Sequence, residues 1–181
     1  AGEGVLRPEI QIETAVWPLR RPPVERPVIS FVAEALKHPA EVPKIACVSI
    51  SETAAEKFVA LTRRIGAELA DAGGPRDPTL VRHLYDLHVM RAHYDSAEVA
   101  SLARAIMLDD VKAYGHQFPA YRKDAIRETL RAVEGLATDP IFADRYAAFA
   151  RDMVYGGSII YEDCLGTINE LAAQLARPPA R

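Results

Sequence analysis

Two stretches near the start of the chain carry the hydrophobic patterns of β-strands. Residues 7–17 (RPEIQIETAVW) alternate apolar and polar positions, which predicts a strand with one buried face. Residues 44–50 (KIACVSI) are apolar on both faces, which is typical of a central strand. The Pro-rich residues 18–27 predict a loop between them, and residues 28–38 predict a short helix. The order strand, helix, strand suggests a βαβ unit.

From residue 51 onward the hydrophobic spacing is helical. A capping-box pattern, Thr53-Ala-Ala-Glu56, predicts the start of the first helix, and the glycines at 73–74 predict its end. The Asp-Pro steps at 77–78 and 139–140 each place an N-cap residue before a proline at the first helical position. The predicted helices cover residues 53–71, 77–93, 96–114, 120–136, 139–155 and 157–176.

These patterns predict an α+β fold that is mostly α. Residues 1–50 would form the partial sheet of one domain, and residues 51–181 would form a helical bundle. Because a two-stranded sheet is marginal on its own, we expect further strands upstream of residue 1. The lack of a Met at Ala1 fits the same expectation of a processed or shortened product.

The composition is that of a soluble globular protein, with 49% hydrophobic and 26% charged residues. A net charge of −3 argues against strong, sequence-independent binding to nucleic acid, but it is compatible with a local basic patch. Neither of the two cysteines lies in a CxxC motif, which favours a reducing, cytoplasmic compartment. The sequence has no apolar run of membrane-spanning length and no signal-peptide pattern.

Charged residues lie beside the apolar stripes of the first two helices of the predicted bundle. Lys57 and Arg64 are seven positions apart and project the same way. They are either a solvated flank whose stems cover the edge of the core, or groups that serve a site. Arg82 and Asp86 are four positions apart in a helix that is apolar on two sides. They either form a structural pair between helices or serve a site.

The histidines and the short motifs of common enzyme classes give little support to other functions. His83, His88 and His93 follow one another at intervals of five, so successive rings point about 140° apart on a helix. Helical zinc sites use the spacing i, i+4, so no zinc site is expected. The patterns GxGxxG, GxxxxGK[ST] and GxSxG are absent, which leaves phosphate-loop and hydrolase functions without support.

Two helix motifs, AEKFVALTRR at 55–64 and RHLYDLHVM at 82–90, resemble the paired motifs of AbiEii-type nucleotidyltransferases. These are the toxins of type IV toxin–antitoxin and abortive-infection systems. The strand LRPEIQIETAVWP and the segment FADRYAAFARDMVYG are also similar to the family, so the resemblance spans nearly the whole chain. The residues that match the helix motifs are Glu56, Lys57, Arg63 or Arg64, Arg82, His83, Tyr85, Asp86 and Leu87.

One part of the family pattern has no counterpart here. The catalytic strand pair of the family carries a Gly-Ser element that holds the triphosphate, followed by an Asp-x-Asp that binds magnesium. No Gly-Ser element followed by Asp-x-Asp occurs in the 181 residues. The resemblance therefore implies the C-terminal portion of a longer toxin, with a remnant of the nucleotidyltransferase sheet. Mg²⁺ and a nucleoside triphosphate are implied for the longer protein, and this chain alone is expected to be inactive and to carry no cofactor.

The resemblance also implies roles for individual residues. Glu13, near the end of its strand, is a candidate catalytic carboxylate and magnesium ligand, although an edge-strand surface carboxylate is the alternative. Lys57, Arg64 and Arg82 would bind the nucleotide, with Lys57 acting from the first turn of its helix. Asp86 is the second catalytic candidate and would orient Lys57 or Arg82. Because the two helices are joined by a short turn, they should pack antiparallel and bring these groups together.

Two functions of different classes follow from these observations. The first is part of a nucleotidyltransferase toxin whose acceptor is tRNA, another nucleic acid or a protein. The second is a non-catalytic helical interaction module that binds an antitoxin or another partner. The residue His83 stands where many relatives have Asp, and the resemblance gives it no role. A Gly-Ser element and an Asp-x-Asp encoded upstream of Ala1 would support the first function, and a start codon near Ala1 the second.

Overall fold

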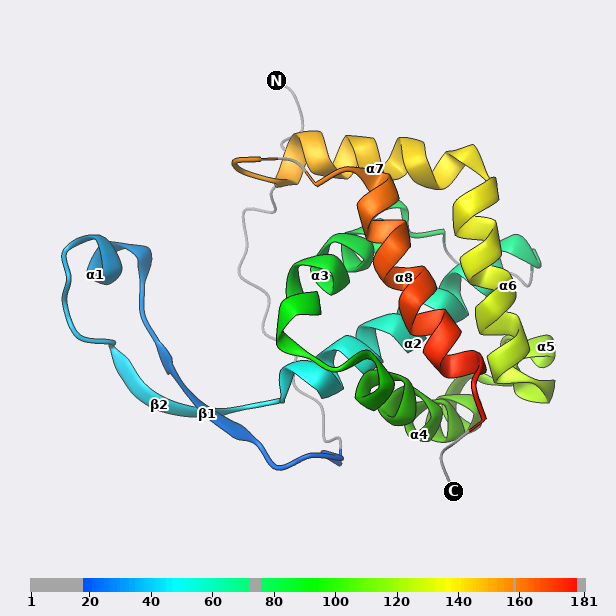
Figure 1. Cartoon of the computed structure of the whole chain (residues 1–181), viewed down its shortest axis with the longest axis horizontal. Helices are drawn as coiled ribbons and strands as arrows, with labels where there is room; N and C mark the ends of the chain where they lie inside the picture. The colour runs from blue at the N-terminus through cyan, green and yellow to red at the C-terminus, as the bar shows by residue number, and fades with distance from the viewer. Residues whose placement is uncertain (1–17, 72–75, 158, 179–181) are drawn as a thin grey trace.

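A computed structural model of the chain describes residues 18–71, 76–157 and 159–178. In this part a helical body carries a long arm that projects to one side (Figure 1). The predicted fold class, α+β and mostly α, is confirmed. The elements are β1 (Val24–Val28), α1 (Phe31–Ala35), β2 (Val42–Cys47), α2 (Ile50–Leu69), the 3₁₀ turn η1 (Pro78–Val81), α3 (Arg82–Met90), the 3₁₀ turn η2 (Arg91–His93), α4 (Ser96–Tyr114), α5 (Pro119–Lys123), α6 (Ala125–Thr138), α7 (Pro140–Met153) and α8 (Tyr161–Ala176).

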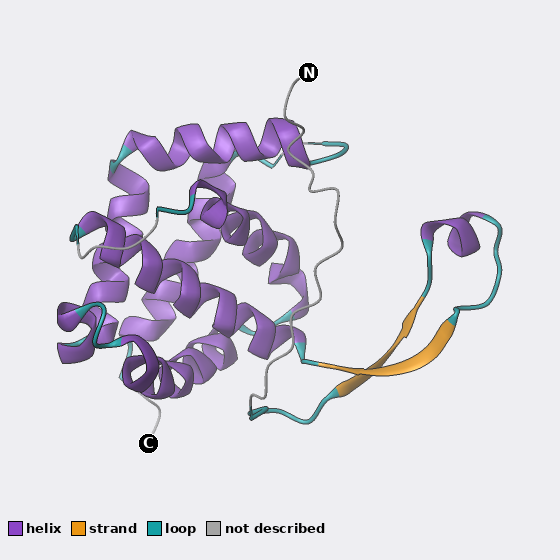
Figure 2. Cartoon of the chain, turned by 180° about the vertical axis from the view of Figure 1, so that it is seen from behind, coloured by secondary structure: helices purple, strands orange, loops and turns teal. Residues whose placement is uncertain are grey.

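The arm, which we define as residues 22–48, is a β-hairpin with a short helix at its tip. Strands β1 and β2 pair antiparallel, with Val24 opposite Cys47 and Val28 opposite Val42. Helix α1 lies in the connection between the strands, at the end farthest from the body (Figure 2). The arm is therefore a narrow extension that is two strands wide.

Several expectations for this region were wrong or lie outside the described residues. Strand β1 overlaps the loop expected at residues 18–27. The register of the β1–β2 ladder shifts between Arg26 and Val28, at Pro27, which has no N–H to donate to a ladder hydrogen bond. Strand β2 is not a central strand, because within the described residues it pairs with β1 alone and no helix covers it. The strand predicted at residues 7–17 lies outside the described residues, together with any βαβ unit that it forms.

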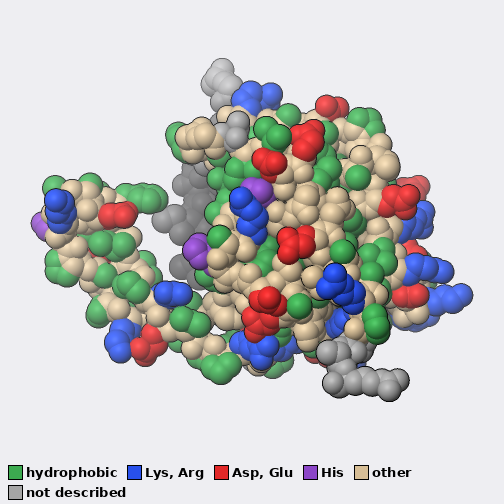
Figure 3. All heavy atoms as spheres, viewed as in Figure 1, with side chains coloured by type: hydrophobic (Ala, Val, Ile, Leu, Met, Phe, Trp, Pro, Cys, Tyr) green, Lys and Arg blue, Asp and Glu red, His purple; other side chains and the backbone are tan. Residues whose placement is uncertain are grey.

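The arm exposes large apolar side chains, which appear as green surface on the projection in Figure 3. Phe31 at its tip is 92% exposed, and Val32 beside it is 69% exposed. Only Ala33 of the short helix is buried. The exposed large apolar residues of the arm are Val24, Val28, Ile29, Phe31, Val32, Leu36, Val42, Ile45 and Val48.

Glu52, in the first turn of α2, fixes both ends of the arm. Its buried carboxylate accepts hydrogen bonds from the backbone N–H groups of Arg20 (2.8 Å) and Arg21 (3.0 Å), which precede the arm. Both arginine side chains also form ion pairs with carboxylates of α4. Ser49, which follows the arm, is the N-cap of α2, and its Oγ accepts from the backbone N–H of Glu52 at 3.2 Å. The chain therefore leaves and re-enters the body at one helical turn.

Local capping explains where the helices begin. Helix α2 starts before the predicted Thr53, because Ser49 and Glu52 form an earlier capping sequence. The predicted helix over 120–136 is two helices, because the Asp124 side chain caps α6 through the backbone N–H of Arg127. The predicted helix over 96–114 and the N-cap at 139 are confirmed.

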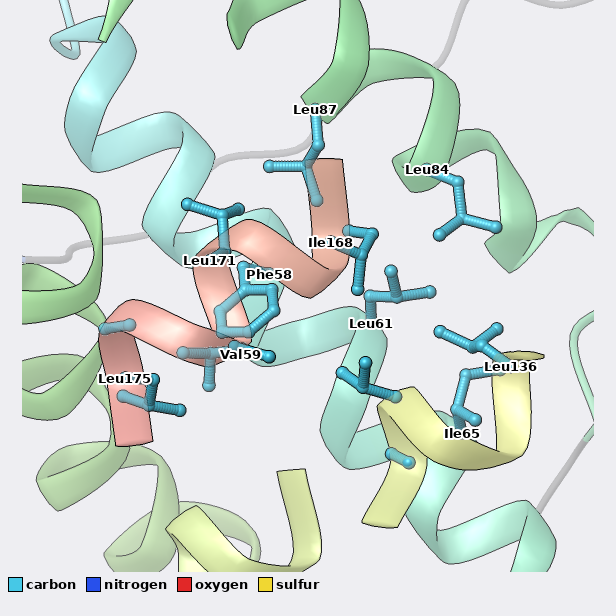
Figure 4. Packing of buried hydrophobic residues seen from close by; sticks show 14 of the residues in the cluster. Phe58, Val59, Leu61, Ile65, Leu84, Leu87, Leu136, Ile168, Leu171 and Leu175 are labelled. Atoms are coloured by element: carbon cyan, nitrogen blue, oxygen red, sulfur yellow. The ribbon is translucent and has the colours of Figure 1, made fainter. Parts of the chain in front are cut away.

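Helix α2 is the centre of the body. It packs against α3, α4 and α6, while α8 packs across α3, α4 and α6. Figure 4 shows Phe58, Leu61 and Ile65 of α2 turned toward leucine and isoleucine side chains of the surrounding helices. Gly135 permits the close approach of α6, because a Cβ there would collide with Leu69 of α2. This core fixes the orientation of every side chain that α2 presents at its remaining face.

Among the described residues, no helix combines the length and the apolar character that crossing a membrane requires.

Candidate functional site

The charged residues of the first motif lie on one strip of α2. The buried residues of α2 face the neighbouring helices, and this strip carries most of the partly exposed residues of α2 before Ala70. The spacing of three and four residues keeps these side chains on one face. The strip consists of Thr53, Glu56, Lys57, Ala60, Arg63, Arg64, Ala67 and Glu68.

Lys57, Asp86 and His83 form a cluster where α2 meets α3. Lys57 Nζ donates a hydrogen bond of 2.7 Å to Asp86 Oδ2. His83 Nδ1 lies 3.5 Å from Lys57 Nζ and 3.8 Å from Asp86 Oδ2. The predicted meeting of Lys57 with Asp86, 29 positions apart, is thus confirmed. The structure adds His83, to which no role was assigned from the sequence pattern.

The cluster favours the ionised form of Asp86. Burial raises the pKa of the Asp86 carboxyl, but the contacts with His83 and Lys57 outweigh burial and hold it below its usual value. The side chains of Lys57 and Asp86 are 29% and 35% exposed, so both are reachable from solvent. The cluster therefore holds an ammonium group beside a carboxylate at a site open to a ligand.

Arg82 and Arg64 lie at a second centre, around Asp77. Arg64 pairs with Asp77 Oδ2 at 3.0 Å. Arg82 donates to Thr79 Oγ1 at 2.8 Å, and Thr79 in turn donates to Asp77 at 2.6 Å. The alternative in which Arg82 and Asp86 form a structural pair was wrong, because Asp86 pairs with Lys57 instead. Arg82 is the first residue of α3, and helical side chains lean toward the N-terminus, so it reaches back to η1.

A hollow of about 370 Å³ lies beside the strip, on the side of α2 that faces α4. Glu56, Arg63, Asp110 and Tyr114 supply its polar lining. The Arg63 guanidinium lies 4.2 Å from the centre of the Tyr114 ring, and its Nε lies 2.9 Å from Asp110 Oδ2. Burial raises the pKa of Glu56, and the nearby Glu52 raises it further. This hollow places an arginine and two acids along the edge of the strip that faces α4.

The sequence indicated these additional residues only in part. Arg63 matched the family motif as an alternative to Arg64, and its stacking on Tyr114 depends on a helix distant in sequence. Asp110 lies in an Asp-Asp pair on α4 that belongs to neither of the two helix motifs. Glu13, the candidate catalytic carboxylate, lies outside the described residues, so its position relative to the cluster stays a prediction.

The described part of the chain contains no preformed cluster of metal-binding side chains. Within residues 18–71, 76–157 and 159–178, no three side chains of His, Cys, Asp or Glu gather in a way that could hold a metal ion. Magnesium is commonly held by one or two carboxylates together with water and substrate phosphates, so a site completed by a bound nucleotide would not need such a cluster.

Comparison with known proteins gives one match. A family model described as "Nucleotidyl transferase AbiEii toxin, Type IV TA system" matches residues 1–167. The matched range includes both helix motifs, the Lys57 cluster and Glu13. No curated protein and no solved structure matches the chain.

Proposed function

The chain belongs to the AbiEii nucleotidyltransferase toxins of type IV toxin–antitoxin systems, and from this premise we propose that its α2–α3 face binds the triphosphate of a nucleotide. In this proposal Lys57 contacts the phosphates and Asp86 keeps the ammonium group in position. Arg64 and Arg82 add positive charge from the neighbouring centre at Asp77. The acceptor of the nucleotidyl group is tRNA, another nucleic acid or a protein.

The observation that carries this proposal is the partly exposed pair of Lys57 and Asp86. A buried pair that only joins two helices repays its desolvation cost when its geometry is good and its other hydrogen-bonding positions are filled. Here both side chains keep about a third of their surface open, and the ammonium group has donors to spare. A phosphate oxygen can therefore reach Lys57 without breaking the pair.

The chemistry of nucleotidyl transfer defines what this face contributes. The acceptor oxygen forms a bond to the α-phosphorus, the bond from that phosphorus to the β-bridging oxygen breaks, and pyrophosphate leaves. Charge builds on the leaving oxygens, and a positioned ammonium group stabilises it. We assign Lys57 this electrostatic role and Asp86 a positioning role. Magnesium would be held elsewhere in the protein, with Glu13 as a candidate ligand.

Two substitutions in the whole encoded protein test the proposal. Lys57→Ala and Asp86→Asn should each abolish growth arrest on expression, because the first removes the positive charge from the phosphates and the second removes the carboxylate that holds this charge in position. The free energy of unfolding should fall by less than about 1 kcal/mol, as is usual for partly exposed pairs. Lys112→Ala is the matched control, because Lys112 forms an exposed 2.8 Å pair with Asp109 and should stay toxic.

The opposite pattern would remove the assignment. Full toxicity of Lys57→Ala and Asp86→Asn, combined with a loss of stability, would show that the pair is structural. That result would favour the second function, binding of a protein partner such as an antitoxin. The apolar side chains exposed on the arm are the observation that supports this second function.

A further inference from the structure

We propose that His83 is a positioning residue that makes phosphate binding at Lys57 depend on pH, so that affinity rises as His83 takes up a proton. This inference rests on the proposed function of the α2–α3 face.

The geometry places His83 against both members of the pair. Its Nδ1 lies 3.5 Å from Lys57 Nζ and 3.8 Å from Asp86 Oδ2, and its side chain is 13% exposed. A neutral ring can accept a hydrogen bond from the ammonium group through Nδ1. A protonated ring has a hydrogen on both nitrogens, so it repels the ammonium group and donates to the carboxylate instead.

The two protonation states give the cluster different charges. With neutral His83, the charges of Lys57 and Asp86 cancel, and the cluster has little net attraction for an anion. With protonated His83, the imidazolium competes for Asp86, and the cluster carries one net positive charge. The ammonium group is then less tightly held by the carboxylate, and phosphate is attracted more strongly. By linkage, a bound phosphate must also favour the protonated ring.

Among the described residues, the charged groups in contact with His83 are Lys57 and Asp86. On α2, Arg64 pairs with Asp77, the N-cap of η1, and η1 itself contains no titratable residue. Arg82 donates to Thr79, Arg91 donates to the backbone carbonyl of His88, and the backbone carbonyl of Asp163 in α8 contacts His88.

The test measures the affinity of the whole encoded protein for tripolyphosphate between pH 8 and pH 5.5. His83→Asn keeps a polar atom near the position of Nδ1 but does not titrate. The ratio of wild-type to His83→Asn affinity cancels the titration of the ligand itself. We expect this ratio to rise by about three- to tenfold as the pH falls across this range. His93→Gln is the control, because His93 is exposed on η2, and its ratio should stay flat.

A second measurement needs no substitution at the site. Tripolyphosphate should shift the NMR titration midpoint of the His83 ring to higher pH in the wild-type protein. A flat affinity ratio, an unshifted midpoint or changes of opposite sign would overturn the role of His83. If Lys57→Ala still removes binding, the proposed function survives that failure. If Lys57→Ala leaves binding intact, the proposed function fails and the inference falls with it.

Discussion

The helical body buries its apolar side chains, whereas the arm exposes side chains of the same types. In the body, apolar side chains of α2, α3, α6 and α8 meet in one continuous core. In the arm, residues of the same chemical types are spread over a two-stranded hairpin and face solvent. Leu61 in α2 has no exposed surface, whereas Phe31 in the arm is almost fully exposed. Apolar content alone therefore does not determine burial.

The difference comes from how many elements surround a residue. A helix inside a bundle has neighbours on several sides, and each buried side chain gains hydrophobic and dispersion energy from all of them. An isolated hairpin has two faces and nothing that closes over them, so its side chains contribute little to folding stability. Large exposed apolar surfaces of this kind are typical of regions that contact another molecule.

The largest contrast should appear on truncating one apolar residue in each region. Leu61→Ala should lower the free energy of unfolding by about 2–5 kcal/mol, because it leaves a cavity in the core. Phe31→Ala should change it by less than about 0.5 kcal/mol, because the ring has few neighbours to lose. Urea unfolding of both variants measures the difference. A cost for Phe31→Ala close to that for Leu61→Ala would show that the tip of the arm is packed in solution.

Ion pairs should show the same contrast at a smaller scale. Arg145 donates two hydrogen bonds, of 2.8 and 3.1 Å, to the carboxylate of Glu68, and both side chains are largely buried. Arg145→Met should cost about 2 kcal/mol, because the carboxylate stays behind without its main partner. In the arm, Lys44 and Glu25 are exposed, so Lys44→Met should cost less than about 0.5 kcal/mol. Equal effects in thermal or urea unfolding would contradict the contrast.

Histidines in the two regions should respond differently to acid. Burial lowers the pKa of His88, and the nearby Arg91 lowers it further, so the folded protein resists a proton that the unfolded chain accepts near pH 6.5. Stability should therefore be full above about pH 6.5 and should decrease as the pH falls from there toward the lower folded pKa.

Unfolding measured between pH 7.5 and pH 5.5 checks this smallest effect. In His88→Gln, the loss of unfolding free energy between pH 7.5 and pH 5.5 should be smaller than in the wild type by about a few tenths of a kcal/mol or more. His38→Gln in the arm should leave the dependence as in the wild type, because His38 is exposed. A slope that is unchanged in His88→Gln would mean that other groups account for the acid response.

Most of the helical body could be predicted from the sequence, because its limits are set by local signals. The helix at 96–114 and the Asp-Pro start at 139–140 depend on residues a few positions apart, and both agree with the structure. The start of α2 was missed, because two capping sequences overlap there. The choice depends on Glu52, which also binds backbone groups 31 and 32 positions away.

The candidate site could be predicted in part. A short connection between antiparallel helices places Lys57 opposite Asp86, and sequence spacing gives that much. The partner of Arg82 depends on which way one flexible side chain turns, and the contact of His83 depends on the offset between two helices. Neither the direction of the Arg82 side chain nor the offset between the two helices is encoded in a local sequence pattern. The roles of Lys57, Arg64, Arg82, Asp86 and Glu13 in nucleotidyl transfer stay predictions.

The attachment of the arm at Glu52 has a consequence for how this region can change over time. Because the chain departs and returns at the same helical turn, residues 22–48 form a closed excursion from the body. Lengthening or shortening such an excursion costs little loop entropy and shifts no register after Ser49. Insertions, deletions and exchanges can therefore accumulate there while the Lys57 face keeps its geometry. Changes in the length of the arm therefore need not alter the positions of the residues that follow it.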